Sequence, residues 1–115
     1  MKTRASTPST KKVLESKVAE KVDKWLLDNR IMFWRISISA LARIRGAEIT
    51  LIPNPMKGWS DRVAIWKGQF IALELKRPVG GEQRADQIIF EAKVKAGGGQ
   101  YHLITNTIQL EGIFI

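Results

Sequence analysis

Three charged residues, Asp61, Glu74 and Lys76, stand at spacings that favour phosphodiester chemistry. The Lys67-Gly68 pair divides two strand-like runs and is typical of a two-residue hairpin turn. In that register Asp61 faces Glu74, and like charges directly opposed across a ladder destabilise a sheet. A raised pKa, a basic neighbour or a bound cation must offset the repulsion. Lys76 lies two residues beyond Glu74 and therefore projects from the same face.

An acid pair beside a lysine suits metal-assisted phosphodiester hydrolysis. Two carboxylates hold a hard cation that polarises a phosphate and lowers the pKa of water, while a lysine stabilises charge or orients the water. A simpler interpretation makes Asp61 a strand-start residue and Glu74 and Lys76 an exposed charge pair. Against it, the run Phe70–Lys76 is apolar on both faces and predicts a central strand. Charged side chains in such a strand cost stability, so we expect them either to be paired with opposite charges or to serve a function.

A third acid, Glu15, falls on the first predicted helix. At about 100° per residue, Val18, Val22 and Leu26 form one apolar stripe, and Glu15 is centred on that stripe one turn before it begins. Glu20 lies about 140° from Glu15, on the solvent face. Either Glu15 reaches the acid pair, or the helix frays there and its carboxylate merely favours the positive helix end.

The pattern predicts one domain over residues 11–115, preceded by a mobile basic tail over residues 1–10. We expect helices over 11–29 and 84–96 and strands over 31–39, 61–66, 69–76 and 101–104. Residues 40–60, with their arginines and prolines, predict a long basic loop that can contain a short strand over 49–52. Residues 108–115 form a short apolar element of undetermined type. Trp25, Trp34 and Trp66 are expected in the core.

Composition narrows the possible ligands. The 115 residues contain 19 Lys and Arg, 11 Asp and Glu, no cysteine and one histidine. A net charge of +8 favours a polyanion such as nucleic acid. Without cysteines, a zinc–thiolate site or a disulfide framework is excluded, and oxygen ligands favour Mg²⁺, Mn²⁺ or Ca²⁺. The absence of a long apolar window and of a signal-peptide pattern predicts a cytoplasmic protein.

These residues together resemble the VRR-NUC family, a branch of the PD-(D/E)XK nuclease superfamily. The resemblance covers roughly Glu15 to Ile104. Its parts are the helix-one glutamate, Trp34-Arg35, Gly58-Trp59-Ser60-Asp61, the strand Phe70–Lys76, and a helix with Gln87-X-X-Phe90 that ends at Gly97-Gly98. Two features depart from the family pattern: Ser60 replaces the usual proline, and the Val-Arg-Arg signature is absent.

The resemblance implies a single-domain α/β fold with an αβββαβ core, in which helices flank a central mixed sheet. It implies that Asp61, Glu74 and the Leu75 backbone carbonyl bind Mg²⁺ or Mn²⁺ and that Glu15 assists. Lys76 would act in catalysis and Gln87 would lie near the site, although Gln87 is also an ordinary polar residue for a helix N-terminus.

The resemblance further implies an endodeoxyribonuclease acting on branched DNA such as four-way Holliday junctions. A small stand-alone protein of this kind is similar to phage-encoded members, which act in the host cytoplasm. A symmetric junction needs two active sites, which predicts a homodimer. Ile113-Phe114-Ile115 and the four tryptophans offer apolar interface material.

Five basic residues flank the predicted site in loops and at a helix start, and are candidate phosphate contacts: Arg43, Arg45, Lys57, Arg77 and Arg84. Two other functions stay open. The chain could be a DNA-binding module without catalysis, or an inactive nuclease-like subunit that only dimerises.

Overall fold

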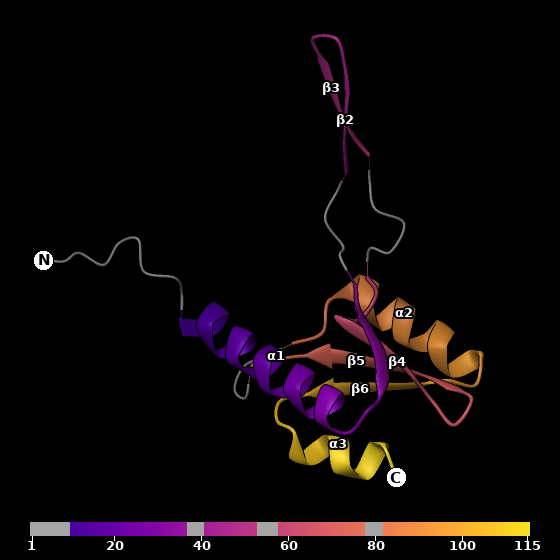
Figure 1. Ribbon diagram of the computed structural model, residues 1–115. Helices are drawn as coiled ribbons and strands as arrows, with labels where there is room; N and C mark the ends of the chain where they lie inside the picture. The colour runs from indigo at the N-terminus through magenta and orange to yellow at the C-terminus, as the bar shows by residue number, and fades with distance from the viewer. Residues whose placement is uncertain (1–9, 37–40, 53–57, 78–81) are drawn as a thin grey trace, which may run out of the picture.

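The computed structural model describes residues 10–36, 41–52, 58–77 and 82–115, and only the backbone of 10–15, 41–45 and 50–52 (Figure 1). Its elements are, in order, α1 (Thr10–Asp28), β1 (Met32–Arg35), β2 (Leu41–Arg45), β3 (Glu48–Ile52), β4 (Arg62–Trp66), β5 (Gln69–Leu75), α2 (Ala85–Ala96), β6 (Gln100–Ile104) and α3 (Ile108–Ile113). The expected basic tail lies almost wholly outside the described residues.

Four strands form a mixed sheet in the order β1-β4-β5-β6. β4 pairs antiparallel with both β1 and β5, whereas β5 and β6 pair in parallel. A parallel pair requires a crossover connection, and α2 supplies it. The expected α/β class, with helices flanking a mixed sheet, is therefore confirmed. With β2 and β3 set aside, the elements follow the order αβββαβ, that is α1, β1, β4, β5, α2 and β6, and α3 comes after them.

Helices α1 and α3 lie on one face of the sheet, and α2 lies on the other (Figure 1). Ile71, Leu73 and Leu75 of β5 pack in the larger core, which contains residues of α1 and α3. Phe70 and Ala72 point to the opposite face, where Phe90 and Val94 of α2 complete a smaller core. The alternation along β5 therefore places Glu74 on the α2 face.

The predicted apolar stripe of α1 is confirmed. Val22 and Leu26 are fully buried and Val18 nearly so, whereas Glu20 is exposed. Burying this stripe against the sheet stabilises the helix more than its intrinsic propensity does. Glu15 lies on α1 in the predicted register, but its side chain is outside the described part.

The β4–β5 hairpin has the predicted register. Trp66 pairs with Gln69, and the ladder continues to Arg62 opposite Leu73. Lys67 and Gly68 both have positive φ, 52° and 80°. Two positive φ values in a two-residue loop are typical of a type I′ turn, whose twist matches that of the strands.

Within residues 40–60, the predicted short strand over 49–52 is confirmed as β3, whereas the loop predicted before it is wrong over 41–45, which form β2. β2 and β3 form a separate two-stranded antiparallel sheet, with Arg43 opposite Thr50 and Arg45 opposite Glu48. In Figure 1 this ribbon stands clear of the four-stranded sheet. Residues of β2 alternate between the two faces of the ribbon, so Arg43 and Arg45 share one face and Ala42 and Ile44 share the other. Lys57 and the prolines Pro53 and Pro55 lie outside the described residues.

Trp34 corrects a second expectation. It was expected in the core, but half of its surface is exposed. β1 is an edge strand and α2 covers the other half of that sheet face, so the side chain of Trp34 meets solvent. Trp25 and Trp66, in contrast, pack against the larger core. No helix in the described part of the chain is long and apolar enough to cross a membrane.

Candidate active site

Asp61 and Glu74 lie together at one end of the β4–β5 hairpin. The Asp61 N–H donates to Glu74 Oε1 at 3.2 Å, and the Leu75 N–H donates to Asp61 Oδ2 at 2.8 Å. The backbone N–H of Asp61 therefore holds the Glu74 carboxylate, and the backbone N–H of Leu75, the residue after Glu74, holds the Asp61 carboxylate. The arrangement extends the hairpin register by one step beyond Arg62–Leu73, so the turn at Lys67-Gly68 indirectly positions both acids.

Glu74 is a buried acid with a strongly raised pKa. Only 3% of its surface is exposed. Burial, and then the charge of Asp61, raise the pKa of Glu74 to about 7, although Lys76 and Gln87 oppose the shift. Near neutral pH this carboxyl therefore exchanges a proton readily, and a bound cation would favour its ionised form.

Lys76 and Gln87 surround the second oxygen of Glu74. Lys76 Nζ lies 3.3 Å from Glu74 Oε2, and the Gln87 amide donates to the same oxygen. Lys76 Nζ also donates to Gln87 Oε1 at 3.3 Å. Lysine, glutamine and glutamate thus form a closed triangle of polar contacts under the first turn of α2.

Gln87 has a structural and a site role at once. Its Oε1 accepts the Arg84 N–H at 2.9 Å, which closes the first turn of α2 as a capping residue does. Its Nε2 contacts Glu74, and only 3% of the residue is exposed. Gln87 is therefore both a polar residue at a helix start, through its contact with Arg84, and a neighbour of the acid pair, through its contact with Glu74.

The segment before Asp61 is tightly constrained. Gly58 has φ of +89°, and a Cβ there would lie 2.8 Å from the Asp86 carbonyl oxygen of α2. Only glycine permits so close an approach at this φ. Ser60, which stands where the resembled family has proline, is fully buried and donates to the Arg62 carbonyl at 2.8 Å. The loop therefore delivers Asp61 to the sheet in one conformation.

An ion pair that the sequence analysis missed also supports Asp61. The Arg62 guanidinium binds both oxygens of Asp23, at 2.7 and 2.9 Å, and so links β4 to α1. Arg62 Nη1 also donates to the Asp61 carbonyl at 3.1 Å, and the Ile36 N–H donates to that carbonyl at 3.0 Å. The available signal was Arg62 itself, because an inward position in an apolar strand requires a partner for a charge.

The remaining predicted residues are spread more widely. Arg77 is half-buried just beyond β5, and Arg84 is exposed at the start of α2, so both flank the acid pair. Arg43 and Arg45 lie on β2 in the separate ribbon, not in a loop. Leu75 ends β5 and donates its N–H to Asp61, while Lys57 lies outside the described residues.

His102 does not contribute to this cluster. It pairs in register with Leu73, so it lies on the sheet face opposite to Glu74. Its ring Nε2 is 2.8 Å from Gln100 Oε1, and burial lowers its pKa. His102 therefore makes no contribution to the polar contacts around Glu74.

Two acids among the described residues, Asp61 and Glu74, lie close enough together to bind one cation. Asp61 and Glu74 supply hard carboxylate oxygens, which suit Mg²⁺ or Mn²⁺. Among the described side chains, no group of three or more His, Cys, Asp or Glu residues converges. Backbone oxygens, water and a substrate phosphate complete the coordination of Mg²⁺ in many proteins, and the two-acid set fits that pattern.

A scan against protein-family models gives no match to this chain, and a search of the curated proteins finds no significant relative. Functional inference therefore depends on the side chains themselves.

Proposed function

We propose that this protein is a metal-dependent endodeoxyribonuclease, similar to the VRR-NUC branch of the PD-(D/E)XK nucleases. The observation that carries the proposal is the buried Glu74 carboxyl beside Asp61, contacted by both Lys76 and Gln87. A protein gains no stability from two acids placed together with one of them 3% exposed. Such an arrangement is typical of sites selected for ligand binding or catalysis.

Asp61, Glu74 and the Leu75 carbonyl would hold Mg²⁺ or Mn²⁺, and Glu15 is the proposed additional acid from α1. The cation would supply polarisation of the phosphate and a lower pKa for its bound water. Glu74 must be ionised to act as a ligand. Its pKa of about 7 therefore predicts that metal binding strengthens as the pH rises through neutrality.

Lys76 is the residue best placed to meet the phosphate. Its side chain is 12% exposed and its ammonium already contacts Glu74 and Gln87 at 3.3 Å. In the proposed reaction it exchanges part of these contacts for a phosphate oxygen or the attacking water. Gln87 keeps Lys76 and Glu74 in position, because it is anchored to the backbone of α2.

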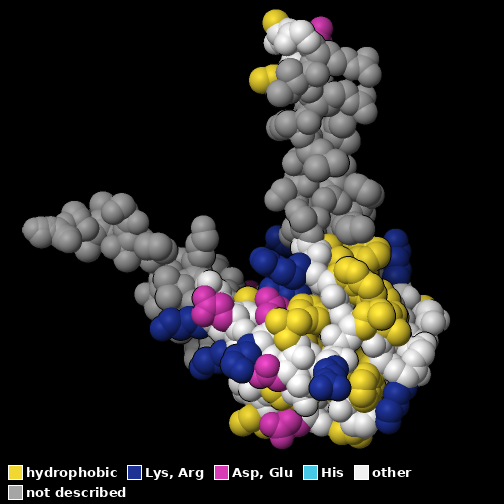
Figure 2. Space-filling view, viewed as in Figure 1, with side chains coloured by type: hydrophobic (Ala, Val, Ile, Leu, Met, Phe, Trp, Pro, Cys, Tyr) yellow, Lys and Arg dark blue, Asp and Glu magenta, His cyan; other side chains and the backbone are white. Residues whose placement is uncertain are grey.

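DNA is the proposed substrate because the chain is strongly basic. The net charge is +8, and Lys and Arg side chains appear at several places on the face shown in Figure 2. Arg77 and Arg84 flank the acid pair, and Arg43 and Arg45 lie on the ribbon. We propose that these residues, with Lys57, contact phosphates, and that branched DNA is the preferred form.

A homodimer remains part of the proposal. Of the expected C-terminal interface residues, Phe114 is 8% exposed and packs against Trp25 and Trp66, whereas Ile115 is 76% exposed. Met32 and Ile65, paired across β1 and β4, are exposed and offer further apolar area. Light scattering at micromolar concentration should give twice the 13.0 kDa chain mass. A monomer that cuts junctions no better than duplex would contradict the dimer.

The test is cleavage of linear, flapped and four-way DNA in Mg²⁺ and in Mn²⁺. Asp61→Asn and Glu74→Gln should each reduce cleavage at least about a hundredfold while DNA binding is kept, because each removes a ligand without removing a basic residue. Asp28→Asn is the matched control: it changes an exposed acid of α1 and should cleave normally. Wild-type protein that binds DNA and cleaves none of these substrates would identify a binding module and refute the proposal.

A further inference from the structure

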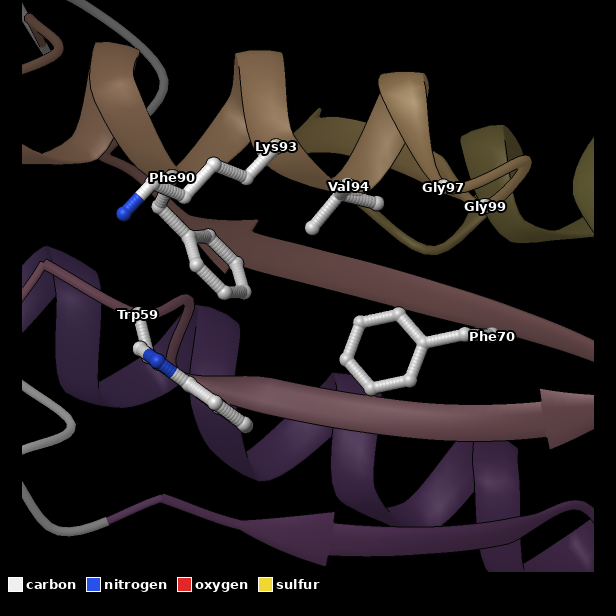
Figure 3. Close-up of a pocket in the computed structure, with 7 residues that line it drawn as sticks. All are labelled: Trp59, Phe70, Phe90, Lys93, Val94, Gly97 and Gly99. Carbon is white, nitrogen blue, oxygen red and sulfur yellow. The ribbon is translucent and has the colours of Figure 1, made fainter.

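An apolar pocket of about 320 Å³ lies between α2 and the sheet, lined by Trp59, Phe70, Phe90 and Lys93, with Val94 and two glycines at its far end (Figure 3). Trp59 stacks on Phe90, with ring centroids 5.1 Å apart and an interplanar angle of 28°. Phe70 meets Trp59 edge-on at 6.3 Å. The rings are thus held in fixed positions by one another, while Trp59 and Phe70 are only half-buried.

The pocket lies on the same face of the sheet as Glu74. Phe70 and Glu74 project from one face of β5, and their Cα atoms are about 13 Å apart along the strand. Trp59 lies two residues before Asp61, and Phe90 lies one turn after Gln87 on α2. A strand bound at the acid pair would therefore bring a neighbouring nucleotide within reach of the aromatic rings.

The charge of the lining limits what can occupy it. Lys93 is the one charged residue among those that line the pocket. In Figure 3 its side chain runs past Phe90, toward the N-terminal end of α2 where Gln87 lies. A ligand that joins a flat ring to a phosphate fits this lining. The ring would lie against the aromatic side chains of Trp59, Phe70 and Phe90, and the phosphate would lie near the Lys93 ammonium. A purely apolar partner would leave the Lys93 ammonium without an oppositely charged group.

We propose that this pocket receives an unpaired base of the bound strand, which stacks on Trp59 while Lys93 contacts the adjoining phosphate. The inference rests on the proposed function, since it assumes that the ligand at the acid pair is DNA. A base within a duplex is stacked on both sides and paired, so it cannot enter. The pocket would therefore select DNA with unpaired nucleotides and would do so with little sequence preference, because every base has a stacking face.

Binding in EDTA tests the pocket separately from catalysis. The probes are a single-stranded oligothymidylate and a fully paired duplex of equal length. Trp59→Leu should weaken single-strand binding by about 5- to 150-fold, the range expected for one stacked base, and change duplex binding far less. Equal losses for both probes, or no loss for either, would overturn the proposal. An apolar protein partner for the pocket would give the second of these results.

A lysine pair on α2 covers the case in which Trp59→Leu does not fold. Lys93 and Lys95 are both exposed, but only Lys93 lines the pocket. Lys93→Gln should weaken single-strand binding and reduce the salt slope by about one, whereas Lys95→Gln should change neither. Identical behaviour of the two variants would overturn the proposed phosphate contact.

The results also separate this inference from the nuclease proposal. Strand binding that depends on Trp59, in a protein that cleaves nothing in Mg²⁺ or Mn²⁺, would refute the nuclease and retain the pocket. Cleavage with single-strand affinity unaffected by Trp59→Leu and Lys93→Gln would refute the pocket and retain the nuclease. Wild-type protein that binds neither probe would refute the pocket, and cleavage of branched DNA in Mg²⁺ and Mn²⁺ would still decide the nuclease proposal.

Discussion

Removing one partner of the ion pair between Asp23 and Arg62 should cost this small fold a large share of its stability, because it leaves a buried charge unpaired. Asp23→Ala removes both oxygens that the guanidinium contacts at 2.7 and 2.9 Å. The Arg62 side chain is 7% exposed, so water cannot replace the lost carboxylate. Breaking a buried pair from one side costs about 3–5 kcal/mol. Since the Asp23 side chain is 25% exposed, we expect a value near the lower end, about 3 kcal/mol.

Thermal and urea unfolding would measure this cost. For a domain of this size about 3 kcal/mol corresponds to a fall in Tm of roughly 10–20 °C. Asp28→Ala is a matched control on the same helix, because its partner Lys24 is 76% exposed and such a pair contributes about 0.5 kcal/mol or less. Replacing both partners, as in Asp23→Ala with Arg62→Met, should recover much of the loss.

A loss of stability in Asp23→Ala no larger than that in Asp28→Ala would show that burial does not decide what this ion pair contributes. A functional readout follows from the second contact of Arg62, which donates to the Asp61 carbonyl. At a temperature where Asp23→Ala is still folded, we expect weaker Mg²⁺ binding than in the Asp28→Ala control, because Asp61 loses part of its support.

Other predictions concern the acids and the loop. Glu15→Gln should reduce cleavage about a hundredfold and Glu20→Gln less than twofold, as cleavage rates would show; reversed effects would mean that the helix register does not apply at Glu15. Burial raises the pKa of Glu74 from 4.5 to about 7, so the folded state binds the proton more tightly than the unfolded chain. The free energy of unfolding should therefore fall by about 3 kcal/mol between pH 4.5 and 7, and chemical unfolding of Glu74→Gln should lack this fall. At pH 8, millimolar Mg²⁺ should raise the Tm of the wild type but not that of Glu74→Gln. Gly58→Ala should cost about 2 kcal/mol in urea unfolding, because its Cβ would collide with the Asp86 carbonyl at a strained φ; an unchanged midpoint would contradict the close approach.

Local rules were sufficient for much of this protein. A two-residue turn at Lys67-Gly68 sets the hairpin register, and side chains alternate with period two, so Asp61 and Glu74 could be placed together from the sequence. The helical period likewise determined that Val22 would be buried and Glu20 exposed. Both inferences hold because they depend on backbone geometry over a few residues.

Only the tertiary structure decided which distant residues meet. Gln87 reaches Glu74 because α2 crosses the sheet face on which Glu74 lies, and Asp23 meets Arg62 across 39 residues of chain. Trp34 is exposed because β1 is an edge strand beyond the cover of α2. Strand order and the placement of helices depend on the free energy of the whole packed core, which no local pattern encodes. For the same reason the arginines of β2 gave no local sign of the ribbon that pairs Arg45 with Glu48.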